Sequence, residues 1–322
     1  MDSLLASFLT PNPQPSSQSS VLSSRKRMHD AITIGIIGAG RAGGALAAAF
    51  AAAGYRVVAL SSEASDSARA LAQRIGATAV DAPVDVARAA SLVFLATPDA
   101  AITPVCRAIA ELDGWRAGQY AVHCSGALGR EALADAAEAG ALTGGFHPLQ
   151  TLAGPDTAAR LRGAYVAVDA DPPLAAILHT LARATGAIPF DFDAQHRTLY
   201  HAAAVMVANY TIALYACGMH LLENAGVPDE VQAHALLPLL RGAVEGLERA
   251  TPSEALTGPI ARGDDVTVAR HIAALEAQAP QLLPIYRALG RVALALARNI
   301  PERRAQALAA LLDDCRTLNV ER

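Results

Sequence analysis

Lysine is almost absent from this sequence. Of its 26 basic residues only one is a lysine, Lys26, and it lies near the N-terminus. The body of the chain therefore has no amine side chain for Schiff-base chemistry or for proton transfer. Any proton transfer falls to histidine, a carboxylate, tyrosine, cysteine or water.

Cysteine, aromatic residues and excess positive charge are also scarce. The four cysteines are scattered and form no C-x-x-C pair, which is typical of reduced thiols in a cytoplasmic protein. The net charge is −4 and only 4% of residues are aromatic, with no basic stripe. This composition argues against a nucleic acid as partner. No set of histidines and carboxylates has metal-ligand spacing, so we predict no metal.

Residues 1–30 differ from the rest of the chain, because serine, glutamine and proline dominate them. Such a segment buries too little apolar surface to offset the entropy lost on ordering, so we predict a disordered tail. The basic cluster at 25–27 follows the short apolar stretch at 4–9, whereas a signal peptide has the reverse order. Met28 is an alternative start.

The most informative motif is a glycine-rich junction between a predicted strand and a predicted helix. An apolar strand at 31–37 leads into G-A-G-R-A-G and then into an alanine-rich helix that ends near Gly54. The first glycine of such a motif permits a tight turn, the second lets a pyrophosphate approach, and the third lets the helix pack closely. The helix N-terminus attracts phosphates. The motif predicts a dinucleotide site formed by Gly38, Ala39, Gly40, Arg41, Ala42 and Gly43.

Strand and helix patterns alternate as far as residue 192, which predicts a doubly wound, mostly parallel, Rossmann-like sheet of the α/β class over 31–192. The further strands expected are 55–60, 78–80, 92–96, 120–123, 142–146, 165–168 and 188–192. From 193 to 322 only helical patterns remain, which predicts an all-α domain. Its expected roles in substrate binding and dimerisation are implied by the family resemblance described below. The helices expected there include 195–224, 230–250, 280–298 and 302–318.

The segment 199–222 is apolar enough to raise the question of a membrane span. Polar residues interrupt it and no basic anchors flank it, so we predict no membrane contact. We interpret it as a core helix of the all-α domain and as a candidate interface of a homodimer.

Polar residues follow several predicted strands, at the edge where open parallel sheets bind ligands. They add Ser61, Ser62, Thr97, Pro98, Ser125 and Gly126 to the predicted cofactor site. The two serines stand where NAD enzymes usually carry an acidic residue, and with Arg41 they suit a 2′-phosphate. Glu63 is evidence for NAD instead. We therefore predict NADP as the cofactor, with NAD as the alternative.

Four motifs together resemble one bacterial family. They are H-C-S-G-A at 123–127, F-H-P-L-Q-T at 146–151, Y-H-A-A-A at 200–204 and L-T-G-P-I-A-R-G-D at 256–264. The family consists of Rossmann-like proteins with a C-terminal helical domain of unknown function, often labelled oxidoreductases. Its layout is similar to ketopantoate reductase and pyrroline-5-carboxylate reductase. The resemblance implies that the helical domain closes the cofactor cleft and forms a dimer.

Candidate catalytic residues follow from the motifs and from this layout. His201 stands near the start of the long helix, where some of these relatives keep a catalytic lysine, and is the candidate proton donor. Asn209 is eight residues further on, roughly on the same helix face. Arg262 suits a substrate carboxylate, and His147 is a candidate for facing the nicotinamide. For each of these residues a purely structural role remains the alternative.

The sequence thus predicts a cytoplasmic NAD(P)H-dependent reductase that transfers hydride to the C=O or C=N group of a small, carboxylate-bearing molecule. A 2-oxo acid such as ketopantoate fits the layout, although the missing lysine argues against the usual ketopantoate mechanism. The alternative is a sensor protein that binds NADP(H) without turnover.

Overall fold

The computed structural model describes residues 32–63 and 65–313. The predicted tail and the alternative start at Met28 lie outside the described residues. The chain divides into two compact units, residues 1–205 and 206–322, and the division falls within one long helix. Each unit is described by itself.

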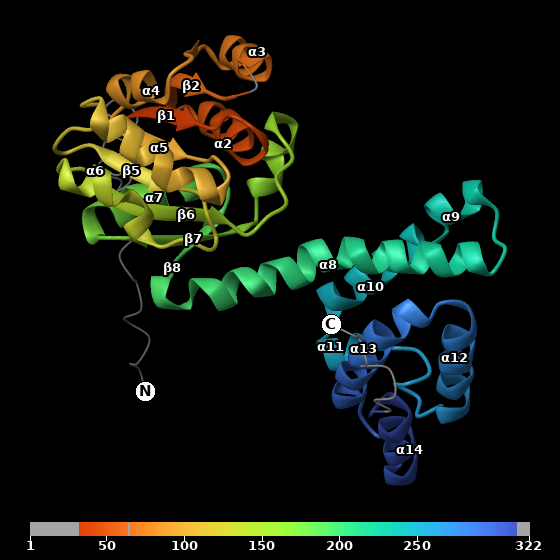
Figure 1. The fold of residues 1–322 in the computed structure, drawn as a ribbon. Helices are drawn as coiled ribbons and strands as arrows, with labels where there is room; N and C mark the ends of the chain where they lie inside the picture. The colour runs from red at the N-terminus through yellow and green to blue at the C-terminus, as the bar shows by residue number, and fades with distance from the viewer. Residues whose placement is uncertain (1–31, 64, 314–322) are drawn as a thin grey trace, which may run out of the picture. The chain divides into compact units, whose positions relative to one another are not determined.

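The first unit is built on a sheet of eight strands in the order β3-β2-β1-β4-β5-β6-β7-β8 (Figure 1). Strand β7 runs antiparallel to β6, and the other neighbouring strands pair in parallel. This confirms the predicted doubly wound, mostly parallel sheet. The strands are β1 (Thr33–Ile37), β2 (Arg56–Ser61), β3 (Thr78–Ala79), β4 (Leu92–Leu95), β5 (Tyr120–His123), β6 (Leu142–Pro148), β7 (Tyr165–Ala170) and β8 (Ile188–Asp191).

Helices cover both faces of this sheet, and each face has its own apolar core (Figure 1). On one face the rings of Phe50, Phe94 and Phe146 pack together, with centroids 5.2 to 6.1 Å apart. Such a cluster is stabilised by apolar burial and by edge-to-face contact. The helices are α2 (Arg41–Ala52), α3 (Ser65–Ile75), α4 (Pro83–Ala89), α5 (Asp99–Glu111), α6 (Ala134–Glu138) and α7 (Pro172–Ala184), with 3₁₀ turns η1 (Arg130–Leu133) and η2 (Pro155–Leu161).

The long helix α8 (Arg197–Asn224) follows the turn η3 (Ala194–His196). Its first residues belong to the first unit and the rest to the second. The expectation of a core helix is wrong for the chain by itself, because Leu199 and Val207 are 76% and 75% exposed. By length and composition alone this is also the one helix in the described ranges that could cross a membrane, which is weak evidence for a span.

The second unit consists of helices, as predicted. The helix expected at 230–250 is interrupted at Leu236, because Pro238 lacks an N–H and its ring clashes with the preceding turn. The apolar core of the second unit is formed by α12 to α14 and includes Val268, Leu283 and Leu308. The helices are α9 (Asp229–Ala235), α10 (Leu237–Arg249), α11 (Pro252–Ala255), α12 (Asp265–Gln278), α13 (Leu283–Leu296) and α14 (Glu302–Asp313), with the turn η4 (Pro280–Leu282) before α13.

Candidate dinucleotide and catalytic site

The glycine loop between β1 and α2 has the backbone geometry that its sequence predicts. Gly38 has a φ of +89°, and a Cβ there would lie 2.7 Å from the backbone nitrogen of Thr97. The N–H groups of Gly38 and Ala39 donate to the carbonyl of Ser61, at 2.9 and 3.0 Å. The loop is therefore held against the ends of β2 and β4, and it takes no side chain at its first glycine.

The second and third glycines face different surroundings. A Cβ on Gly40 would have no heavy atom within 4 Å, so this position opens onto free space. A Cβ on Gly43 would collide with the carbonyl oxygen of Gly38 and lie 2.9 Å from the Cβ of Ala96. Gly43 thus allows α2 to pack on the sheet, whereas Gly40 leaves room for a ligand.

A cavity of about 530 Å³ lies beside this loop. The hydroxyl of Thr97 is buried and has no hydrogen-bond partner among the described residues. The open space at Gly40, this unsatisfied hydroxyl and the N-terminus of α2 fit the phosphates of a dinucleotide. Lining residues that the sequence predicted are Gly38, Gly40, Arg41, Ala42, Ser61, Ser62, Thr97 and Pro98; Glu63 and Asp81 also line it.

Four predicted cofactor residues do not line this cavity. Ala39 and Gly43 are buried within the loop and helix. Ser125 is also buried, and its hydroxyl accepts hydrogen bonds from the backbone N–H groups of Ala127 and Leu128, at 3.0 and 3.1 Å. The Ser125 side chain therefore shapes its own turn, and its cofactor contact stays a prediction.

The fourth of these residues, Gly126, makes room for two histidines. A Cβ on Gly126 would lie 2.8 Å from both Nε2 of His147 and Nδ1 of His201. His147 is the second-to-last residue of β6, and His201 lies on the first turns of α8. The structure thus brings together two predicted catalytic residues from distant parts of the chain.

Tyr200 joins these histidines, and the sequence analysis missed it. Its hydroxyl lies 2.9 Å from Nδ1 of His147, and its ring packs on Phe192 with centroids 4.6 Å apart. Nδ1 of His201 is buried and has no hydrogen-bond partner within the described ranges. The signal in the sequence was the motif Y-H-A-A-A, in which the tyrosine precedes the histidine.

The surroundings fix the protonation of two of these groups. Burial, with smaller effects of His201 and Arg197, lowers the pKa of His147 to about 4. Burial raises the pKa of Tyr200 to about 12. At neutral pH His147 is therefore a neutral imidazole and Tyr200 a protonated phenol, so the phenol can donate to Nδ1 and leave Nε2 to carry the ring proton.

His123, at the end of β5, is a structural residue. It is fully buried, and burial together with the nearby Arg197 lowers its pKa to about 3. A neutral, inaccessible ring of this kind is unsuited to exchange protons with a substrate.

Asn209 and Arg262 are exposed and belong to the second unit, so the structure does not place them relative to the histidines. Asp264, next to Arg262, caps α12 by accepting a hydrogen bond from the N–H of Thr267 at 3.0 Å. Asp264 thus has a structural role as a helix cap, and Arg262 is solvent-exposed. In residues 32–63 and 65–313 no three metal-ligating side chains cluster.

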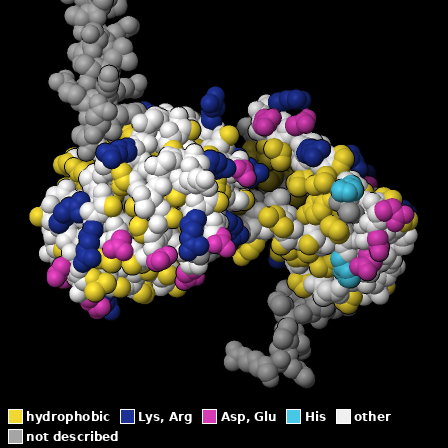
Figure 2. All heavy atoms as spheres, turned by 90° about the horizontal axis from the view of Figure 1, so that it is seen from above, with side chains coloured by type: hydrophobic (Ala, Val, Ile, Leu, Met, Phe, Trp, Pro, Cys, Tyr) yellow, Lys and Arg dark blue, Asp and Glu magenta, His cyan; other side chains and the backbone are white. Residues whose placement is uncertain are grey.

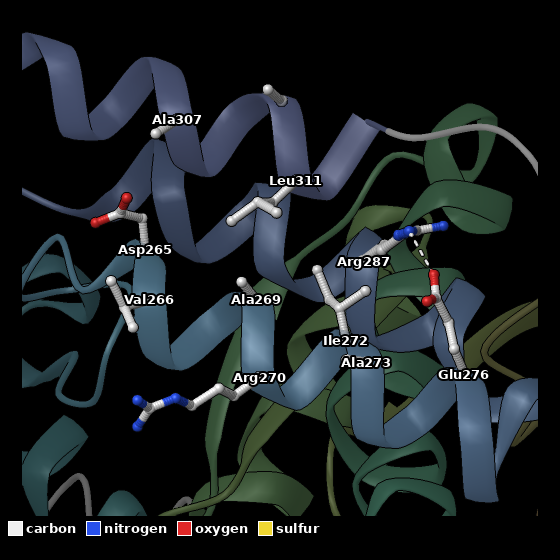
Figure 3. Close-up of a pocket in the computed structure, with 11 residues that line it drawn as sticks. Asp265, Val266, Ala269, Arg270, Ile272, Ala273, Glu276, Arg287, Ala307 and Leu311 are labelled. Carbon is white, nitrogen blue, oxygen red and sulfur yellow. Dashed lines mark hydrogen bonds and ion pairs between the residues drawn. The ribbon is translucent and has the colours of Figure 1, made fainter.

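The helical unit has a hollow of its own, of about 780 Å³, between α12 and α14 (Figure 3). At one end Arg287 pairs with Glu276, with 3.4 Å between Nη2 and Oε1. Most of the other lining side chains are apolar, and Asp265 and Arg270 add two charges. The predicted catalytic residues are not among those that line it.

Family models match both parts of the chain. A Rossmann-like domain matches residues 14–148, and the domain of unknown function DUF2520 matches residues 164–293. No curated protein matches the sequence.

Solved structures of similar fold cover most of the chain. A Bacteroides fragilis protein, BF3122, provisionally named an NADP oxidoreductase, is 28% identical, with a TM-score of 0.69 over 83% of this chain and 99% of that one. Protein TM1727 from Thermotoga maritima is 22% identical, with a TM-score of 0.62 over 82% and 98%. An imine reductase from Myxococcus stipitatus in complex with NADP+ is 20% identical, with a TM-score of 0.53 over 76% and 88%.

The two domain matches follow each other in the order that the motifs implied. The chain therefore joins a Rossmann-like domain to a C-terminal domain of the DUF2520 type.

Proposed function

We propose that this protein is an oxidoreductase that uses NAD(P)H to reduce a C=O or C=N group of a small, carboxylate-bearing substrate. The observation that carries the proposal is the presence, in one unit, of a glycine-loop cavity and a separate cluster of His147, Tyr200 and His201. The likeness to the Bacteroides fragilis NADP oxidoreductase supports it. A cofactor cavity by itself would suit binding, whereas the cluster adds groups that can move protons.

The chemistry divides between the cofactor and the side chains. Bound NAD(P)H supplies the hydride, and the oxygen or nitrogen of the reduced group then needs a proton. His201 is our candidate donor of that proton. The neutral His147, held by Tyr200, offers an Nε2–H that can polarise the reacting group without transferring its proton, as neutral imidazoles do in other active sites. Asn209 and Arg262 are proposed to hold the substrate and its carboxylate.

The substrate class remains a proposal based on layout and chemistry. A 2-oxo acid such as ketopantoate suits a carbonyl-reducing site with a fixed cation. The fold that the chain shares with an imine reductase makes cyclic imines with a carboxylate an equally reasonable set to test.

A titration with NADPH and NADH, followed by nicotinamide fluorescence, tests the cofactor. We expect NADPH to bind more tightly, because Arg41 and Ser62 line the cavity where a 2′-phosphate would lie. Glu63 and Asp81 line the same cavity and oppose that phosphate. Glu63→Gln should therefore raise NADPH affinity by roughly 3- to 10-fold and lower NADH affinity, because a ribose diol would lose its charged acceptor.

The same titration can contradict the proposal. If neither nucleotide binds at high micromolar concentration, both the reductase and the NADP(H) sensor fail. If NADPH binds but no carbonyl or imine substrate is reduced, the sensor becomes the better reading. The unpaired Nδ1 of His201 and the exposed Arg262 support the enzyme, since a sensor would have no need of them.

We also propose that the protein is a homodimer of the cytoplasm. Apolar side chains of α8 and α10, among them Val207, Ile212 and Leu239, are 69% to 75% exposed, and Figure 2 shows apolar side chains gathered on the surface. Large exposed apolar patches are typical of interfaces. We expect twice the chain mass in light scattering, and Val207→Glu should shift the protein towards monomer. A wild-type monomer at micromolar concentration would contradict this.

A further inference from the structure

Arg197, at the first position of α8, is a buried charged residue. Its side chain is 2% exposed, and it reaches two different segments of the sheet. Nη1 donates to the carbonyl oxygen of Ser125 at 3.1 Å, and Nη2 lies 3.3 Å from Oδ2 of Asp169. Burying a cation is costly unless it is paired and hydrogen-bonded, so this placement needs a compensating role.

The position of Arg197 on the helix suggests that role. Tyr200 and His201 follow it by three and four residues, so all three side chains leave the same face of α8. The three side chains reach different parts of the sheet edge. Arg197 binds the turn after β5, Tyr200 binds His147 near the end of β6, and His201 lies beside Gly126. One face of α8 thus carries Tyr200 and His201 of the cluster together with Arg197, which is the most deeply buried of the three side chains.

We propose that Arg197 is a positioning residue, which fixes the start of α8 so that Tyr200 and His201 face His147 and Gly126. The inference deepens the proposed function and rests on it for its catalytic meaning. The contacts of Arg197 themselves do not depend on any substrate.

The sheet is adapted to receive this side chain. A Cβ on Gly145, in the middle of β6, would collide with Nη2 of Arg197 and lie 3.1 Å from His123. Asp169 faces Gly145 across the β6–β7 ladder and is itself 8% exposed. Arg130 approaches the other oxygen of Asp169, with 3.3 Å between Nε and Oδ1. The carboxylate therefore stands between two guanidinium groups.

Arg197 also contributes a positive charge close to the cluster. His147 is influenced by His201 and Arg197 from α8, by Asp99 from α5, and by its hydrogen bond to Tyr200. Asp99 favours the imidazolium form, whereas Arg197 opposes it. Burial is the main reason that His147 is neutral, and the guanidinium of Arg197 adds to this effect. A neutral His147 can accept a hydrogen bond at Nδ1 from the phenol of Tyr200.

Two variants separate position from charge in the full-length protein. Arg197→Met removes the hydrogen bonds and the positive charge of the guanidinium. We therefore expect the pKa of His147, measured from its imidazole NMR signals, to rise by about one unit. Arg197→Lys keeps the charge but its single ammonium cannot reproduce the two-branched contact. We expect it to leave that pKa near its wild-type value and to alter the ¹⁵N shift of Nδ1, as the bond to Tyr200 weakens.

Arg130→Met is the matched control, because Arg130 also pairs with Asp169 but lies outside α8 and is not among the groups that shift the pKa of His147. It should leave the His147 signals unchanged.

Where a substrate is available, both Arg197 variants should lower kcat at least about 10-fold, and NADPH affinity should change less than 2-fold.

Wild-type His147 signals in Arg197→Lys would overturn the proposal, and so would equal effects of Arg130→Met. If Arg197→Met does not fold, the lysine variant decides. The NMR measurement needs neither cofactor nor substrate, so it can be made even if the reductase proposal fails. If the wild-type enzyme turns over and both Arg197 variants show wild-type His147 NMR signals, only the positioning role is refuted.

Discussion

Gly40→Asp should abolish dinucleotide binding without weakening the fold. Gly40 is the N-cap of α2, and a Cβ there meets no protein atom within 4 Å. Aspartate is a favourable N-cap residue, so the unfolding temperature should stay the same or rise slightly. Its carboxylate would occupy the space left for the pyrophosphate and repel it. We expect the dissociation constant for NADPH to rise by on the order of 100-fold or more.

Two companion variants make the result specific. Gly40→Asn adds nearly the same volume without the charge, so it should lose less affinity than the aspartate and separate charge from bulk. Gly43→Ala should behave differently, since its Cβ collides with the loop backbone and approaches Ala96 to 2.9 Å. It should lower the unfolding free energy by roughly 1–3 kcal/mol and reduce binding as well. Normal NADPH binding by Gly40→Asp would mean that the cavity holds another ligand.

His201→Gln should lower kcat by about 10²- to 10⁴-fold, the range expected when a general acid is removed. Glutamine keeps a polar side chain of similar reach but has no titratable proton. His147→Asn should cost less, roughly 10- to 100-fold, because in our proposal it polarises the reacting group without giving up its proton. The measurement is the loss of nicotinamide absorbance under single-turnover conditions, with 2-oxo acids and cyclic imines as substrates.

Nucleotide affinity is the control for these variants. Neither histidine lines the glycine-loop cavity, so the dissociation constant for NADPH should stay within about 3-fold of wild type. Tyr200→Phe should give a smaller loss than His147→Asn, because the imidazole remains but its tautomer is no longer fixed. If His201→Gln and His147→Asn both retain full turnover, the proton donor lies elsewhere in the protein.

The sequence by itself determined the features that depend on short stretches of chain. The apolar strands, the glycine loop and the helix after it could be predicted because their patterns are local, and the strands and helices of the sheet domain follow one another along the chain as predicted. The roles of Gly38 and Gly43 follow from the same local geometry. The break at Leu236 was missed, because the apolar periodicity continues through it. Pro238 was the local signal for this break, since proline disrupts the interior of a helix.

The tertiary structure decided which distant residues meet. His147 and His201 were each predicted, but their common position beside Gly126 depends on how α8 begins against the sheet. Tyr200 and Arg197 acquire a role only through partners in other strands, at His147, Ser125 and Asp169. Such contacts leave little periodic trace in a sequence, because each involves one side chain and is set by packing over the whole unit.

The tertiary structure also decided what α8 covers and what Ser125 does. An apolar helix of this length reads as a core helix, yet in a single chain its side chains stay exposed, because burial depends on what packs against a helix and not on its composition. Ser125 reads as a ligand contact at a strand end, but its hydroxyl satisfies two backbone N–H groups of its own turn. Hydrophobicity gave α8 a tendency to be buried, and residue type gave Ser125 a tendency to form hydrogen bonds. The residues that surround each of them in the fold determined whether the helix is buried and which groups the hydroxyl binds.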